Sequence, residues 1–191
     1  MSPLKIALLI ASFLFIDIAF AASNDLKNDN LQYTFVESRD GYAFKGKFFV
    51  VAKDSCLMGI IYEPEHLKKI LKNRCTVNIV SKGRDTHVLS YIYKLPLIEI
   101  KSTYRKTLRF AERKVIFDMT GYEQKGVFLP RVLSSQGSYQ ITQEKYGYWV
   151  GYYQECKIDN SGVRSIFLFF AKSEAIKFLK DLKAYAERTC H

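Results

Sequence analysis

Apolar and polar residues alternate with a period of two through the middle of the chain, a pattern typical of β-strands that bury one face. The alternation is clearest from Leu89 to Tyr93 and from Tyr148 to Tyr152. Short turns between successive segments favour an antiparallel meander. The pattern predicts strands over residues 75–81, 86–95, 98–110, 114–120, 133–143 and 145–158, with the longest turn over 121–130.

A β-hairpin is expected before this meander. Residues 31–38 and 42–53 both have strand character, and Arg39-Asp40-Gly41 between them is a turn signal. The preceding residues 22–30 are polar and predict a flexible leader. Because no linker or internal repeat follows, we expect residues 31–191 to form a single domain.

Helices are predicted in two places. Asp54-Ser55 is a candidate cap for a short helix over 56–62, and Pro64 fits the start of a second one over 65–72. After the meander, residues 163–188 predict one long amphipathic helix. Its apolar residues recur on one face at Ala171, Ala175, Phe178, Leu182 and Tyr185.

Residues 1–21 have the three parts of a secretory signal peptide. Lys5 supplies a positive charge, residues 6–20 form an almost unbroken apolar run, and Ala19-Phe20-Ala21 is a small-x-small cleavage site. An uncleaved membrane anchor is the alternative, but a spanning helix needs about 20 apolar residues, and Asp17 interrupts this shorter run. We expect cleavage before Ala22 and a soluble mature protein that is periplasmic or secreted.

Charge and ring content narrow the choice of partners. The formal net charge is +10, and cleavage leaves it unchanged because residues 1–21 hold one Lys and one Asp. For an exported protein, such a surface favours transient contact with an anionic membrane over nucleic acid, although scattered basic residues are also common on a merely solvated surface. Aromatic residues make up 15% of the chain. They pack an ordinary β-rich core or line an apolar cavity, and composition favours the core.

The four cysteines, Cys56, Cys75, Cys156 and Cys190, lie at wide and irregular spacings. The absence of a Cys-x-x-Cys pair argues against a zinc site and against a thioredoxin-like redox site. Export makes disulfides possible, and the sequence leaves three full pairings open.

Catalytic motifs are missing from the sequence. It contains no Gly-x-Ser-x-Gly elbow, phosphate-binding Gly-rich loop or dinucleotide fingerprint. His66, His87 and His191 share no spacing typical of metal ligands, and we expect His66 to be a surface residue of the second short helix. We therefore expect no metal, no cofactor and no catalytic residues.

Three short motifs support a family resemblance. Leu95-Pro96-Leu97 resembles a Leu-Pro-x-Pro stretch, residues 137–141 (Gly-Ser-Tyr-Gln-Ile) a Gly-x-Trp/Tyr-x-Ile/Leu strand, and residues 159–162 the turn before a final helix. With the order of elements, they make the chain similar to the START/SRPBCC (pollen-allergen-like) superfamily of helix-grip proteins. The Arg-Asp pair common after the Pro stretch is replaced by Lys101-Ser102, and Ile98 replaces the second Pro. A lipocalin, the alternative fold, lacks support because no Gly-x-Trp occurs near the first strand.

The resemblance implies an α+β fold in which a curved antiparallel sheet wraps around a long C-terminal α-helix and encloses a cavity for a lipid or other hydrophobic small molecule. We therefore expect an exported, non-enzymatic binder or carrier. The alternatives are a surface or interaction protein with a filled core and a cyclase- or hydrolase-like enzyme. Candidates for the cavity wall are Leu89, Tyr91, Tyr93, Tyr104, Phe117, Tyr139, Tyr148 or Trp149, Tyr152, Phe170, Phe178 and Leu182.

The same resemblance bears on the cysteines. In a helix-grip protein the two short helices lie beside the end of the long helix. That arrangement brings Cys190 towards Cys56 or Cys75 and keeps it far from Cys156, so a disulfide between Cys190 and one of the first two is expected.

Overall fold

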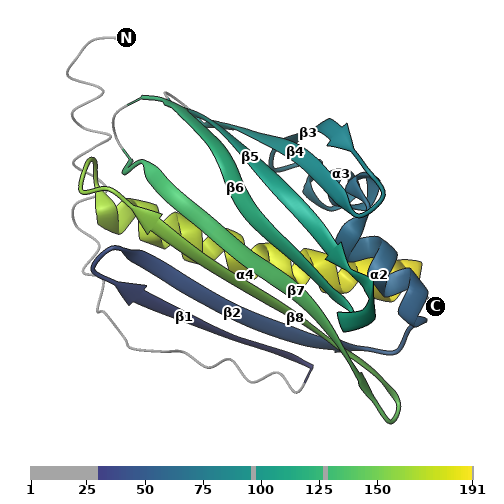
Figure 1. Ribbon diagram of the computed structural model, residues 1–191. Coiled ribbons are helices and arrows are strands. Elements are labelled where there is room, and N and C mark those ends of the chain that lie inside the picture. The colour runs from purple at the N-terminus through teal and green to yellow at the C-terminus, as the bar shows by residue number, and fades with distance from the viewer. Residues whose placement is uncertain (1–29, 96–97, 127–128, 191) are drawn as a thin grey trace.

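The computed structural model describes residues 30–95, 98–126 and 129–190, which form an antiparallel sheet and three α-helices (Figure 1). The sheet has eight strands in the order β1-β2-β8-β7-β6-β5-β4-β3 within the described residues. The strands are β1 (Leu31–Ser38), β2 (Gly41–Val50), β3 (Thr76–Lys82), β4 (Thr86–Leu95), β5 (Ile98–Arg109), β6 (Lys114–Lys125), β7 (Val132–Glu144) and β8 (Gly147–Ile158). The helices are α2 (Asp54–Tyr62), α3 (Pro64–Leu71) and α4 (Arg164–Thr189), and a 3-10 turn, η1 (Phe110–Glu112), joins β5 to β6.

The sheet curves around α4, which crosses behind the strands in Figure 1. The main backbone contacts of α4 are with β2, β1, α2 and α3. The two short helices lie beside the C-terminal end of α4. This arrangement is the predicted α+β helix-grip fold.

The first hairpin forms as predicted, with a glycine directly after its turn. Ser38 pairs with Gly41, so Arg39 and Asp40 alone make the turn. Gly41 has a φ of 156°, and a Cβ there would lie 1.8 Å from the carbonyl oxygen of Cys156, so only glycine fits. The second strand ends at Val50, before the predicted limit at residue 53.

The predicted cap of the first short helix is wrong. Lys53 is the N-cap residue and makes no side-chain cap hydrogen bond. Asp54 is already helical, and its carboxylate instead pairs with Arg113 at 3.0 Å. Arg113 comes from the connection between β5 and β6, so local sequence could not reveal this contact. The second short helix begins at Pro64.

Residues 121–130 are not one long turn, because β6 continues to Lys125. Gly121 pairs with Thr103, and the register shifts between Thr103 and Tyr104 so that Thr120 has no partner. Such a bulge lets a strand continue through a residue that carries a turn signal.

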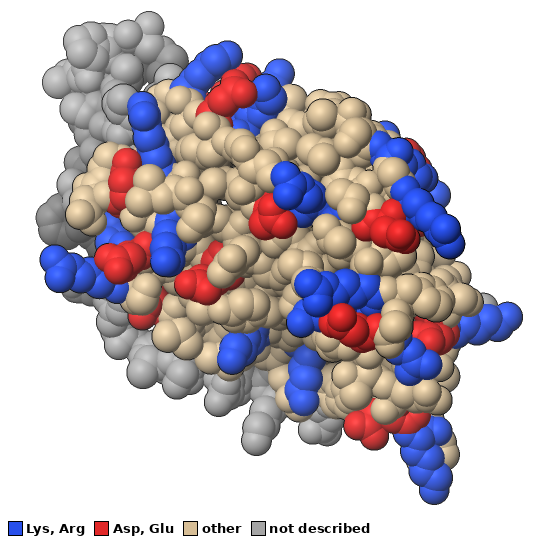
Figure 2. Space-filling model, in the orientation of Figure 1, with Lys and Arg blue, Asp and Glu red and all other residues tan. Residues whose placement is uncertain are grey.

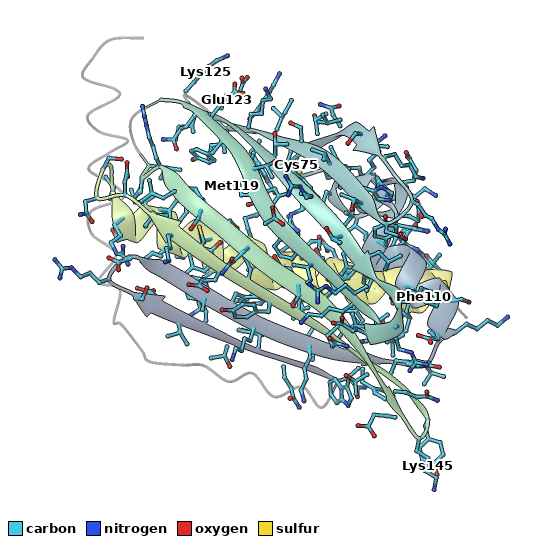
Figure 3. The ribbon with its side chains drawn as sticks, viewed as in Figure 1. Cys75, Phe110, Met119, Glu123, Lys125 and Lys145 are labelled. Carbon is cyan, nitrogen blue, oxygen red and sulfur yellow. A yellow bond between two sulfur atoms is a disulfide. The ribbon has the colours of Figure 1, made fainter. Side chains whose placement is uncertain are left out.

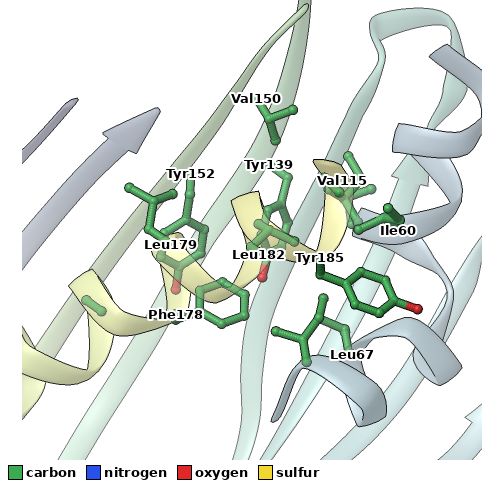
Figure 4. Packing of buried hydrophobic residues seen from close by; sticks show 14 of the residues in the cluster. Ile60, Leu67, Val115, Tyr139, Val150, Tyr152, Phe178, Leu179, Leu182 and Tyr185 are labelled. Carbon is green, nitrogen blue, oxygen red and sulfur yellow. The ribbon is translucent and has the colours of Figure 1, made fainter. Parts of the chain in front are cut away.

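The core lies between α4 and the concave face of the sheet (Figure 4). Leu179 is fully buried and packs over Gly46, where a Cβ would approach its Cδ2 atom to 2.4 Å. The predicted apolar face of the helix is therefore largely correct, with Ala171 only half-buried. The buried residues of α4 are Leu168, Ala175, Phe178, Leu179, Leu182, Tyr185 and Ala186.

The C-terminus is tied to α2 by a disulfide between Cys56 and Cys190, whose Cα atoms are 5.7 Å apart. This is one of the two pairings that the resemblance implies. Cys75 and Cys156 are free thiols. The described part of the chain has no helix that is both long and apolar enough to cross a membrane.

His66 was expected on the surface of the second short helix, and it is only partly exposed there. It is half-buried, and its Nδ1 lies 2.9 Å from the hydroxyl oxygen of Tyr185 on α4. Two elements distant in sequence meet here, which helical periodicity alone does not reveal. The predicted signal peptide and most of the predicted leader lie outside the described residues.

Candidate functional site

A continuous band of rings crosses the concave face from β4 to α4. We name as the aromatic band the residues Tyr91, Tyr104, Phe117, Tyr139, Tyr152 and Phe178. Their ring centroids are 5.7 Å apart for Tyr91–Tyr104, 6.0 Å for Tyr104–Phe117, 5.6 Å for Phe117–Tyr139, 5.1 Å for Tyr139–Tyr152 and 5.4 Å for Tyr152–Phe178. Side chains alternate between the two faces along each strand, and the five strand residues of the band all point to the concave face. Phe178 faces them from α4.

The two ends of the band differ in exposure. Tyr139 and Tyr152 are only 6% and 9% exposed and pack against Phe178 of α4 (Figure 4). Tyr91 and Tyr104 are half-buried at the other end. We call the part formed by β2, β7 and β8 with α4 the closed half, and the part formed by β4, β5 and β6 the open half.

The tyrosine hydroxyls of the open half are removed from bulk water although the residues keep some exposed surface. Burial raises the pKa of Tyr104 to about 12 and raises the pKa of Tyr91 further, and it raises the pKa of Tyr93 well above its usual value. Tyr91, Tyr93 and Tyr104 thus combine partly exposed side chains with hydroxyls held away from bulk water. Such hydroxyls stay neutral and offer hydrogen bonds within an apolar wall.

Ion pairs on the sheet surface cross the end of the open half. Lys101 binds Glu123 at 2.8 Å, and Lys125 binds Glu99 at 3.1 Å. Figure 3 labels Glu123 and Lys125. Exposed pairs of this kind contribute little to stability.

Most predicted wall residues lie on the concave face. Leu89 is fully buried, Leu182 is buried on α4, and Tyr93 and Tyr148 are half-buried. Trp149 is on the opposite, convex face, where its ring contacts Phe49 at 5.6 Å. The period of two excludes it from the wall, because its neighbours in sequence point inwards.

Phe170 does not line the gap between helix and sheet either, since it is 48% exposed. At about 3.6 residues per turn, Phe170 is rotated by about 80° around the helix axis from Phe178, which places it at the edge of the face that packs on the sheet. It belongs to an exposed group on the first turns of α4 that we name the apolar patch, which contains Val163, Ile166, Phe169 and Phe170.

Two polar residues of the concave face were not predicted from the sequence as part of the site. Lys106 on β5 is buried, and its Nζ donates a hydrogen bond to the carbonyl oxygen of Ile61 at 2.7 Å. Burial lowers the pKa of Lys106 to about 7. His87 on β4 is buried beside it in the register of the two strands. Strand periodicity could have identified both residues. Lys106 follows Tyr104 by two positions and His87 precedes Leu89 by two, so each shares the inward face of its strand.

The convex face has different chemistry. A shallow groove of about 400 Å³ crosses β1, β2, β8 and β7, and Lys45, Lys47 and Tyr153 are among its lining residues. Basic and acidic side chains are interspersed over the side of the sheet seen in Figure 2.

Within residues 30–95, 98–126 and 129–190, no group of three or more His, Cys, Asp or Glu side chains is placed to hold a metal ion.

No protein-family model and no curated protein matches the sequence. The fold, in contrast, matches several solved structures. The STAR-related lipid transfer protein from Xanthomonas axonopodis has a TM-score of 0.63 and 11% identity, over 87% of this chain and 97% of that one. The human StarD13 lipid transfer and protein localization domain has a TM-score of 0.58 and 13% identity, over 97% of this chain and 98% of that one.

A catalytic protein also shares this architecture. The Zhui aromatase/cyclase from Streptomyces sp. R1128 matches with a TM-score of 0.62 and 12% identity, over 83% of this chain and 94% of that one. At such low identities the likenesses show the fold alone. The chain has the helix-grip fold of START/SRPBCC proteins.

Proposed function

We propose that the protein binds a hydrophobic ligand, a lipid, between the concave face and α4 and carries it outside the cytoplasm. The aromatic band is the observation that carries this proposal. It joins a packed, buried end to an end where Tyr91 and Tyr104 keep exposed surface in a desolvated setting. An apolar wall with a few hydroxyls is the usual lining of a site for an apolar small molecule.

The similar structures support a lipid over other ligands, since two of them are named for lipid transfer. An enzyme is the second candidate, because an aromatase/cyclase shares the fold. A bound, chemically unchanged lipid favours the carrier, whereas chemical conversion of the bound ligand favours the enzyme.

Export is part of the proposal. Residues 1–21 act as a signal peptide that is cleaved before Ala22, and residues 22–30 lead into the ligand-binding domain over 31–191. The disulfide between Cys56 and Cys190 supports an oxidising compartment, because such bonds are rare in the reducing cytosol. Fractionation of cells and sequencing of the mature N-terminus test this part.

The apolar patch is the proposed point of contact with membranes. Phe169 and Phe170 are 64% and 48% exposed, and the chain has a net charge of +10. Exposed aromatic side chains on a basic protein suit transient binding to an anionic lipid surface. Pelleting with anionic vesicles should weaken as salt rises, and the Phe169→Ser/Phe170→Ser variant should pellet several-fold less than the wild type.

Native mass spectrometry of the mature, exported protein tests the ligand itself. We expect an added mass that disappears on organic extraction and that extraction identifies as lipid. A protein that carries no such mass, and that takes up no lipid from mixed vesicles, would contradict the proposal and would favour an interaction protein with a filled core.

A further inference from the structure

A buried lysine and a buried histidine occupy paired positions on the concave face. Lys106 of β5 is the register partner of His87 of β4, and the two side chains are only 2% and 1% exposed. We name Lys106 and His87 the basic pair. Burial of such groups is costly unless their hydrogen-bonding capacity and charge are satisfied.

The hydrogen-bonding capacity and the charge of Lys106 are satisfied only in part. Its Nζ donates to the carbonyl oxygen of Ile61 in the last turn of α2, where carbonyls lack helical partners and a cation is favoured. This contact helps to hold α2 on the sheet, but an ammonium has three N–H donors. The carboxylate that acts on Lys106 through space is Glu63, which already binds Lys82 at 2.8 Å. No described carboxylate forms an ion pair with Lys106.

The hydrogen-bonding capacity of His87 is used even less. Its ring stacks on Tyr62 with centroids 4.2 Å apart, and neither ring nitrogen has a hydrogen-bond partner among the described residues. Burial also lowers the pKa of this imidazole. The neutral ring has one donor and one acceptor, and both are unused.

The basic pair adjoins the aromatic band. The Nζ of Lys106 lies 5.2 Å above the ring centroid of Tyr139, and Tyr104 is the next inward residue on the same strand. A ligand that lies along the band towards Tyr91 would therefore have one end beside the basic pair.

We infer that the basic pair binds the carboxylate head group of an acidic lipid, whose tail extends along the aromatic band into the open half. This inference rests on the proposed function and specifies the class of ligand. The carboxylate accepts hydrogen bonds from the unused N–H groups of Lys106 and from an N–H group of His87. It also supplies the counter-charge that Lys106 lacks. Uncharged esters of the same chain length lose this interaction.

The binding of acid should also depend on pH. The free protein holds the Lys106 amine with a pKa of about 7, so protonation must accompany binding of the anion at higher pH. The groups that face the basic pair are Glu63 at the start of α3, Lys82 on β3, Tyr62 on α2 and Tyr139 on β7. Affinity for the acid should fall as pH rises from about 7 to about 9, whereas affinity for an ester should not change.

A matched pair of fluorescent probes tests the inference. Mature protein stripped of lipid is titrated with cis-parinaric acid and with its methyl ester, which differ only in the head group. The wild type should bind the acid at least about tenfold more tightly than the ester at pH 6.5 to 7. Lys106→Met should reduce this ratio to about one, while Lys101→Met, which removes an exposed lysine of the same strand, should keep it.

Two results would overturn the inference. If the wild type binds acid and ester equally well and without pH dependence, the basic pair is structural and the proposed lipid carrier stands without it. If neither probe binds, the inference and the proposed function both fail. The wild-type ratio and its pH profile decide the question even if Lys106→Met does not fold.

Discussion

The closed and open halves of the concave face are built from the same residue types but are packed differently. Phe44, Tyr139 and Tyr152 are buried in the closed half, where α4 covers them. Tyr91, Tyr93 and Tyr104 in the open half remain half-buried. The comparison indicates that ring content alone does not distinguish core from binding wall. What differs is exposure, because the rings under α4 and Phe117 of β6 are buried, whereas Tyr91, Tyr93 and Tyr104 keep some exposed surface.

The largest effect on stability should follow truncation in the closed half. Phe44 is fully buried, and its ring contacts Tyr152 with centroids 5.9 Å apart. Phe44→Ala should lower the free energy of unfolding by about 3–5 kcal/mol, through lost burial and the cavity it leaves. Phe110→Ala, at a site that is 73% exposed, is the matched control and should change it by less than about 0.5 kcal/mol. Urea denaturation measures both, and equal losses would mean that the closed half is not the core.

The disulfide should have the next largest effect, because it holds the C-terminal end of α4 over the closed half. The bond joins residues that are 134 positions apart. Cys56→Ser/Cys190→Ser should lower the free energy of unfolding by about 2–4 kcal/mol, and Cys75→Ser, which removes a free thiol, should lower it less. A double variant as stable as the wild type would show that α4 is held without the bond.

Truncation in the open half should affect ligand binding more than stability. Tyr91→Ala should weaken lipid binding by about tenfold, since a ring of the wall is lost, with a modest loss of stability. Tyr146→Ala at the tip of the β7–β8 hairpin, where Lys145 is labelled in Figure 3, removes a ring that is 71% exposed and should leave binding unchanged. Lipid titration of the two variants side by side would contradict the account if both bound like the wild type.

The dependence of stability on pH tests the buried lysine of the open half. The pKa of Lys106 is lowered from 10.5 to about 7 in the folded protein. Below pH 7 both the folded and the unfolded states hold the proton, so the cost of burying the charge is fully present. Above about 7 the unfolded state binds more protons, so the free energy of unfolding should rise with pH, by at most about 1.4 kcal/mol per unit, until about 10.5.

Lys106→Met provides the reference for this slope. The difference in free energy of unfolding between wild type and variant should grow in favour of the wild type between pH 7 and pH 9.5. Chemical denaturation at several pH values measures it, and a constant difference would show that Lys106 keeps an ordinary pKa.

Local patterns in the sequence predict much of the fold. The alternation at β4 and β8 and the glycine at the first turn correctly predict strands and the hairpin, because side-chain period and turn chemistry are local properties. The extension of β6 through Gly121 and the pairing of Asp54 with Arg113 depend on partners distant in sequence. Local patterns do not contain that information.

The sequence predicts only part of the candidate site, because strand alternation is a local property whereas burial depends on elements distant in sequence. Strand alternation places Tyr91 and Tyr139 on one face and, applied strictly, excludes Trp149. It also places Lys106 and His87 inside, but residue type suggests a surface lysine and overrides position. The half-buried state of Tyr104 depends on where α4 lies, and amphipathicity does not specify that placement.

Hydrogen exchange of the mature protein, stripped of lipid and then loaded with it, tests the central claim most directly. The account predicts that loading slows exchange of backbone amides in β4, β5 and β6, where the open half is filled, and changes β2 and β8 little. Protection that is absent, or that falls on β1, β2 and β8 beside the convex groove, would contradict it.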